Sequence, residues 1–264
     1  MACYASGHAS ESRLNTDGGS SLGVAIRRAK RVLLRRRGPT TQRPVSQYID
    51  FKGTLAAAAE QGLSVGDYID QRYNQPGVTH ETMDKLAELG AFAGVDRVCE
   101  IGPGSGRYLA ETIRRCNPSH YEIYETATDW RDWLVATYGV VANKPDLRTM
   151  AATPSASIDL VQAHKVFTTI APVPSIRYLL EMQRIVRSGG RVAFDAVTED
   201  CLDRQTIENW VVSGSDYETH PSFIPKKVVL DLFEQGRFSL VGSFIEPMEP
   251  GTTCCFIFQK PDAG

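Results

Sequence analysis

The pattern of apolar and polar positions divides the chain into segments of two kinds. Short, largely apolar runs at residues 97–101, 156–164 and 191–195 have the length of strands buried on both faces of a sheet. In residues 174–186, apolar side chains recur every three or four positions, as they do on one face of a helix. Strands that alternate with such helices predict an α/β protein whose sheet is covered on both sides.

The segment before the first strand has a purely helical pattern. Three helices are expected at residues 48–61, 65–73 and 80–89, with glycines near their ends. We therefore expect a helical cap over residues 44–92, followed by the sheet domain over residues 93–264.

The N-terminal residues differ from the rest of the chain in their charge. Residues 1–43 carry nine Lys or Arg against two acidic residues and are expected to be a disordered tail. Within them, residues 24–37 form a basic amphipathic segment that suits an anionic membrane surface, although a solvated charged tail is the alternative. The remaining chain is acidic, which argues against a nucleic-acid partner.

The composition also indicates where in the cell the protein is located. No apolar run reaches the roughly 20 residues that span a bilayer, and the N-terminus lacks the features of a signal peptide. The six cysteines show no C-x-x-C pair and no zinc spacing, so reduced thiols and no metal site are expected. A cytoplasmic protein follows, with contact at the inner membrane face if residues 24–37 bind lipid.

The richest chemistry lies in residues 98–109, which read as a buried strand, a glycine turn and the start of a helix. Gly102, Gly104 and Gly106 allow positive φ angles and close approach of a ligand to the backbone. A dinucleotide-binding turn would need a third glycine at the position of Arg107. Glu100, just before the turn, would repel a diphosphate but attract an ammonium or sulfonium group.

This glycine turn resembles motif I of the class I S-adenosylmethionine (SAM) dependent methyltransferases. The resemblance extends over residues 80–260 and includes a Ser-Gly-Gly turn at residues 188–190 before a strand. It implies a Rossmann-like, doubly wound, seven-stranded sheet of order 3-2-1-4-5-7-6 with the last strand antiparallel. It also implies that SAM is the cofactor, bound by Glu100 and the three glycines.

Further residues are candidates for the nucleoside part of SAM. Glu125 ends an alternating strand 19 residues after Gly106, a spacing at which a carboxylate reaches the ribose hydroxyls. The resemblance implies that Asp146 accepts a hydrogen bond from the adenine amino group and that the backbone of Leu147 reaches the ring.

His164 is the candidate general base. It stands at the carboxyl end of the strand in residues 156–164, and histidine has a pKa suited to proton removal near neutrality. The alternative is that His164 only lines the SAM pocket or packs beneath the cap. Asp195, Glu199 and His220 are rival bases or substrate-binding residues.

Similarity to methyltransferases whose N-terminal helices close over the ligand makes Tyr68, Arg72 and Tyr73 candidate lid residues, with ordinary surface packing as the alternative. The chain lacks the [DN]-P-P-[YFW] motif of methyltransferases that act on nucleic-acid bases. We therefore expect O-methylation of a small-molecule, sugar or lipid-linked acceptor. An NAD-type oxidoreductase and a catalytically silent SAM-binding or scaffold protein are the alternatives.

Overall fold

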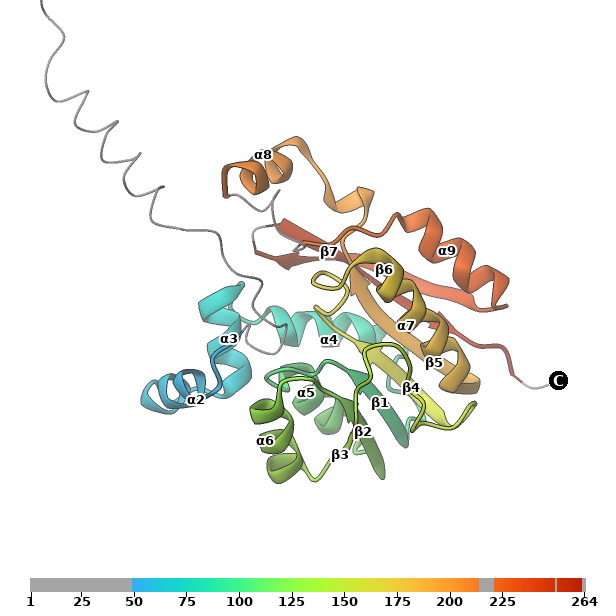
Figure 1. Cartoon of the computed structure of the whole chain (residues 1–264), viewed down its shortest axis with the longest axis horizontal. Coiled ribbons are helices and arrows are strands. Elements are labelled where there is room, and N and C mark those ends of the chain that lie inside the picture. The colour runs from blue at the N-terminus through green and yellow to red at the C-terminus, as the bar shows by residue number, and fades with distance from the viewer. Residues whose placement is uncertain (1–48, 214–220, 250, 263–264) are drawn as a thin grey trace, which may run out of the picture. The chain divides into compact units, whose positions relative to one another are not determined.

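Seven strands form one mixed sheet in the computed structural model (Figure 1), which describes residues 49–213, 221–249 and 251–262. The strands are β1 (Arg97–Ile101), β2 (His120–Tyr124), β3 (Val141–Asn143), β4 (Ile158–Ala163), β5 (Val186–Ala196), β6 (Ser239–Met248) and β7 (Gly251–Gln259). The helices are α2 (Phe51–Glu60), α3 (Val65–Tyr73), α4 (Val78–Glu88), α5 (Arg107–Cys116), α6 (Thr128–Tyr138), α7 (Pro172–Ile185), η2 (Glu199–Cys201), α8 (Arg204–Ser213) and α9 (Lys226–Gln235).

The strand order is β3-β2-β1-β4-β5-β7-β6. Strands β1 to β5 pair in parallel with their neighbours, whereas β7 is antiparallel to both β5 and β6. The predicted Rossmann-like fold and its strand order are confirmed. The central strands are buried without alternation because both of their faces are covered, and all six residues of β4 are buried.

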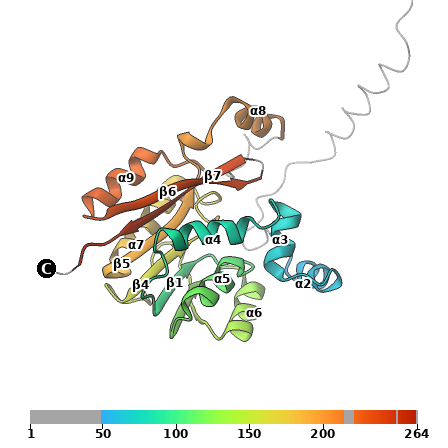
Figure 2. The ribbon, with the colours of Figure 1, turned by 180° about the vertical axis from the view of Figure 1, so that it is seen from behind.

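Helices cover the two faces of the sheet and create two hydrophobic cores (Figures 1 and 2). On one face, α4, α5 and α6 pack on the sheet through residues such as Leu86, Leu109 and Leu134. On the other face, α7 and α9 pack through residues such as Leu179 and Phe233. The two cores do not fill the edge of the sheet formed by the carboxyl ends of the parallel strands, and this is the edge at which such sheets bind ligands.

Two details of the local structure differ from the sequence expectation. The expected turn at residues 188–190 lies inside β5, which begins at Val186 directly after α7. Gly190 is needed there because a Cβ atom would come within 2.9 Å of the backbone oxygen of Asp159. Helix α4 begins earlier than expected, at Val78, after Gly77 at a φ of 82°.

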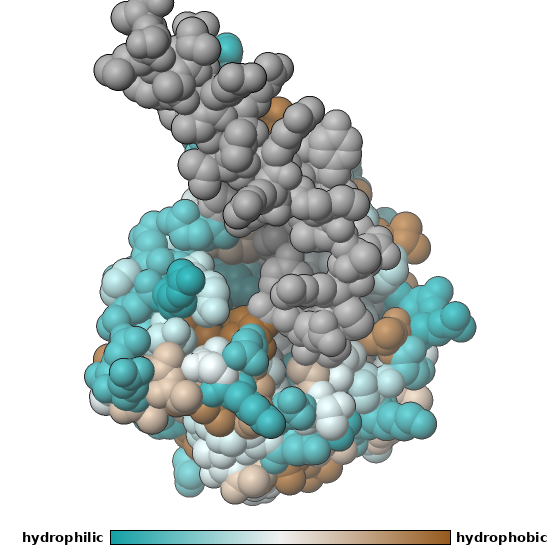
Figure 3. Space-filling model, turned by 60° about the vertical axis from the view of Figure 1, so that its left-hand side comes forward, coloured by the Kyte–Doolittle hydropathy of each residue, from teal (hydrophilic) through white to brown (hydrophobic). Residues whose placement is uncertain are grey.

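Hydrophilic and hydrophobic side chains share the surface shown in Figure 3. In the part of the chain that the structure describes, no helix has the length and apolar character of a transmembrane span. The basic segment 24–37 and His220 lie outside the described residues.

Candidate active site

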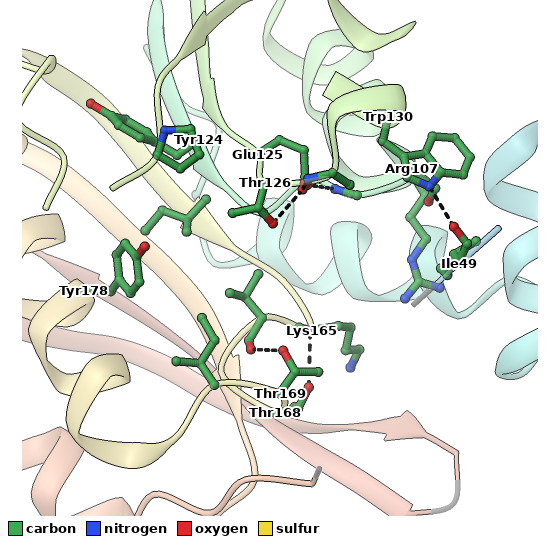
Figure 4. Close-up of a pocket in the computed structure, with 18 of the residues that line it drawn as sticks. Ile49, Arg107, Tyr124, Glu125, Thr126, Trp130, Lys165, Thr168, Thr169 and Tyr178 are labelled. Atoms are coloured by element: carbon green, nitrogen blue, oxygen red, sulfur yellow. Dashed lines mark hydrogen bonds between the residues drawn. The ribbon is translucent and has the colours of Figure 1, made fainter. Parts of the chain in front are cut away.

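A cavity of about 660 Å³ opens at the carboxyl ends of β1, β2 and β4 (Figure 4). The glycine turn after β1 and the residues after β2 form one side. The loops after β3 and β4 and the start of α7 form another, and the ends of α3 and β6 complete the wall. The cavity therefore lies where parallel α/β sheets bind their ligands.

The three glycines of the turn have two roles: two of them line the cavity and the third serves helix packing. Gly102 and Gly104 line the cavity with φ angles of 60° and 53°. Around Gly104 there is no heavy atom within 4 Å of an added Cβ, so the backbone faces open space. Gly106 does not line the cavity. It starts α5, and a Cβ there would collide with Leu134 of α6, so this glycine serves the packing of the two helices.

Glu125 lies in the cavity as the sequence predicts. Its buried carboxylate accepts hydrogen bonds from the backbone N–H groups of Gly104 and Ala127, both at 2.7 Å. These two bonds hold the side chain in place, and the hydroxyl of Thr126 donates a third, longer bond of 3.5 Å to the same carboxylate. The acceptor position that these bonds leave free, together with that of the weak Thr126 bond, can accept from a vicinal diol such as that of ribose.

Glu100 lies elsewhere than predicted. Its carboxylate is buried below the cavity and accepts a short hydrogen bond from the hydroxyl of Tyr121 on β2. Burial raises the pKa of Glu100 to about 7, because its effect is larger than that of the hydrogen bonds from Tyr121 and Gln162, which lower this pKa. The acidic group therefore does not face a cofactor cation, because it lies on the face of the sheet and outside the cavity wall.

The loop after β3 separates the two residues expected to bind adenine. Leu147 lines the cavity with a φ of 60° and is 62% exposed. Asp146 is exposed and does not line the cavity. Its carboxylate accepts from the backbone of Arg148 and Thr149, and hydrogen bonds to Thr149 and Arg148 lower the pKa of Asp146 to about 2. Asp146 thus shapes the loop that presents Leu147.

His164 is also outside the cavity. Its ring stacks on Tyr108 with centroids 4.3 Å apart, and its side chain is 0% exposed. Neither ring nitrogen has a hydrogen-bond partner among the described residues. Burial lowers the pKa of His164, so the ring is neutral near neutrality. The prediction that His164 faces the acceptor or lines the SAM pocket is therefore not supported.

Asp195 and Glu199, the other candidate bases within the described residues, also lie outside the cavity. Asp195 is fully buried in β5 and accepts from the backbone N–H of Lys165 at 2.6 Å. Glu199 lies in η2, where it accepts from the backbone of Lys226 at 2.7 Å. Neither side chain lines the cavity.

The cap contributes to the cavity through α3. Of the three lid candidates, Tyr73 lines the cavity and is 47% exposed, whereas Tyr68 and Arg72 do not line it. The guanidinium of Arg72 lies 5.2 Å from the centre of the Tyr73 ring and so packs over that ring. Ile69, one helical turn earlier, reaches the cavity too and was missed because it reads as an ordinary core residue.

Lys165 is a cavity residue that the sequence pattern did not reveal. Its ammonium lies 2.7 Å from Glu246, 3.4 Å from Asp195 and 2.7 Å from the hydroxyl of Thr253. Burial alone would lower the pKa of Lys165, but Asp195 and Glu246 outweigh it and raise the pKa above its ordinary value. Lys165 is therefore a permanent cation held by side chains distant in the sequence.

Comparison with known proteins assigns the class. A family model described as "Methyltransferase domain" matches residues 71–241, so the chain belongs to the methyltransferase domain family. It is a SAM-dependent methyltransferase, and the family match favours this class over the NAD-type oxidoreductase. No curated protein matches the sequence.

Solved structures with the same fold share little sequence. An O-methyltransferase family protein from Burkholderia thailandensis is 15% identical, with a TM-score of 0.58 over 92% of this chain and 70% of that chain. Magnesium protoporphyrin IX methyltransferase from Synechocystis, solved with bound SAH, is 10% identical, with a TM-score of 0.54 over 90% and 95%. A [4+2]-cyclase is 13% identical, with a TM-score of 0.52 over 69% and 81%. These likenesses concern the fold.

The cavity residues fit SAM. The open backbone at Gly104 leaves room for a ligand, and the carboxylate of Glu125 faces the same space with acceptor capacity for a diol. When SAM is bound it supplies an electrophilic methyl group. The residues of this chain would then hold the donor and the acceptor in line at about 3 Å, which is the main catalytic requirement of such a displacement.

Proposed function

We propose that this methyltransferase transfers the methyl group to an oxygen atom of a small, largely apolar acceptor. The supporting observation is that part of the cavity wall is apolar and comes from residues not assigned to SAM, namely Ile69, Tyr73 and Met248. An apolar wall favours an acceptor with an apolar body, whether free or lipid-linked, over a bare sugar, whose hydroxyls would need more hydrogen-bond partners.

The charges near this wall support an acceptor without a large negative charge. The ammonium of Lys165 is already paired with Glu246 and Asp195. It therefore offers little attraction to a further anion. One structural neighbour is described as an O-methyltransferase family protein and another as a [4+2]-cyclase. Because proteins of this fold differ in their reactions, the proposal that oxygen is the methylated atom rests on the cavity of this protein and needs its own experiment.

Proton removal from an acceptor hydroxyl is assigned to Glu249. Among the described residues that line the cavity, the carboxylates are Glu125 and Glu249, and Glu125 is assigned to the nucleoside. Glu249 is exposed and follows the end of β6, beside Met248. A carboxylate in this place can act as the general base.

Replacement of Glu249 by Gln is expected to lower turnover about 100-fold without changing SAM affinity. His164→Phe is the matched control, because a phenyl ring keeps the stacking on Tyr108 and removes both ring nitrogens. It is expected to retain turnover. Steady-state kinetics and SAM titration measure both variants; a loss confined to His164→Phe would return the role of base to His164.

Transfer of a methyl label from SAM to a component of cell extract tests the proposed activity directly. We expect a product whose label is attached to oxygen, as identified by NMR spectroscopy of the purified compound. Label on nitrogen or carbon would contradict O-methylation. SAM binding without any labelled product would support the silent SAM-binding alternative.

The basic segment 24–37 is proposed to contact an anionic membrane surface from the cytoplasmic side. Deletion of residues 1–43 is expected to reduce binding to anionic vesicles in a salt-sensitive way, while turnover of a soluble acceptor stays the same. Vesicle co-sedimentation at low and high salt measures the effect. Equal sedimentation with and without residues 1–43 would contradict this role.

A further inference from the structure

The end of β6 leads directly into two residues of the cavity wall, Met248 and Glu249. Just before them, Glu246 is 1% exposed, and a buried carboxylate is costly unless it is paired and hydrogen-bonded. Helix α4 of the cap lies beside this strand (Figure 2). The groups that hold Glu246 therefore also place the wall residues that follow it.

Both carboxylate oxygens of Glu246 accept hydrogen bonds from other elements. Oε1 accepts from Nζ of Lys165 at 2.7 Å and from the hydroxyl of Thr253 on β7 at 3.3 Å. Oε2 accepts a short hydrogen bond from the hydroxyl of Thr82 on α4. Within the described ranges, Thr82 is the one hydrogen-bond donor to Oε2, so the cap completes the pairing of this buried carboxylate.

Pro247, the next residue along β6, is held by the cap as well. Its carbonyl oxygen accepts from Nδ2 of Asn74 at 3.3 Å and from Nζ of Lys165 at 3.4 Å. Asn74 is the C-cap of α3, so two cap helices contact the end of β6. Since proline has no N–H group to donate within the sheet, this part of the strand depends more on side-chain contacts.

Thr82 does not line the cavity and is 1% exposed, so its hydroxyl can influence the reaction only through Glu246. Without that hydroxyl, Oε2 would be buried without a donor, and the carboxylate would turn toward Lys165 and move the end of β6 with it. We propose that Thr82 is a positioning residue that acts through Glu246 and places Glu249 against the acceptor. Asn74 supports the same segment from α3. This inference rests on the proposed role of Glu249 as the base.

Thr82→Val tests the inference because it removes the hydroxyl and keeps the shape of the side chain. We expect kcat to fall about 10-fold with unchanged SAM affinity, since a small displacement of a reacting group is enough for such a loss. Thr82→Ser keeps the hydroxyl and should restore turnover. Thr153→Val is the matched control, because the hydroxyl of Thr153 also donates to a buried glutamate, Glu122, and neither side chain lines the cavity. It should keep the turnover of the parent.

The same substitution is then made in the Glu249→Gln variant. Two residues that act as a unit have non-additive effects, so Thr82→Val should change the remaining turnover less than about 2-fold in that background. A purely structural role of Thr82 would instead lower turnover equally in both backgrounds. That result, or full turnover of Thr82→Val in the parent background, would overturn the proposal.

Hydrogen exchange of a peptide within residues 240–249, measured by mass spectrometry, separates this proposal from the assignment of the base. Exchange should be faster in Thr82→Val than in the parent. Asn74→Ala removes the other cap contact at a half-buried residue and should have the same effect, also if Thr82→Val does not fold. Unchanged exchange would contradict the positioning role. Full turnover of Glu249→Gln with faster exchange in Thr82→Val would refute Glu249 as the base and support the placement of β6 by Thr82.

Discussion

Gly104→Val is expected to abolish SAM binding while the protein still folds. Gly104 has a φ of 53°, lines the cavity and has no heavy atom within 4 Å of an added Cβ. A valine side chain would project into the space that the cofactor needs. Because a branched Cβ also disfavours a positive φ, the backbone would shift and displace the N–H group that donates to Glu125. We expect affinity to fall more than about 100-fold in calorimetric titration, a loss of about 2.7 kcal/mol or more.

Gly139→Val is the matched control for this substitution. Gly139 ends α6 at a φ of 68°, also without a heavy atom within 4 Å of an added Cβ, but it does not line the cavity. The backbone strain should therefore be similar, and SAM should bind as it does to the parent protein. Retention of SAM affinity in a folded Gly104→Val variant would mean that the glycine turn does not hold the cofactor.

Lys165→Met is expected to lower the free energy of unfolding by about 3 to 5 kcal/mol, because it leaves the carboxylates of Asp195 and Glu246 buried without their cation. The pKa of Lys165 is raised in the folded protein, so its stabilisation is present below its ordinary pKa and is lost only as pH rises through the higher value. The difference between parent and variant should therefore stay constant from about pH 6 to about pH 9. Urea denaturation measures it.

An exposed ion pair provides the comparison. Lys227 is 80% exposed on α9 and lies 2.6 Å from Asp231. Lys227→Met should change the free energy of unfolding by less than about 1 kcal/mol, since solvent screens such pairs. Similar losses in the two variants would contradict the assignment of Lys165 to a buried ionic cluster.

The sequence predicted the fold well because its signals are local. Short, largely apolar runs identified β1 and β4, and a helical period identified α7. The strand order came from the resemblance that the glycine turn suggested. Gly104 and Glu125 reach the cavity because a ligand at a parallel sheet lies beyond the strand ends, and both residues lie within three positions of the end of a strand.

The sequence did not predict the directions in which side chains point or the pairs formed by residues far apart in the chain. Glu100 and His164 lie near strand ends as predicted, but their side chains point into the layers between sheet and helices. Lys165 and Arg107 depend on partners far along the chain, Glu246 and Asp70. No local pattern marks such pairs, because they form only when the sheet and the cap are assembled.

A crystal structure of the protein with S-adenosylhomocysteine tests the central claim most directly. We expect both ribose hydroxyls to lie within hydrogen-bonding distance of the carboxylate of Glu125 and the ligand to pass over Gly104. The sulfur atom should face the space bounded by Tyr73 and Met248. Binding of the ligand at another place, or with its ribose away from Glu125, would contradict the account.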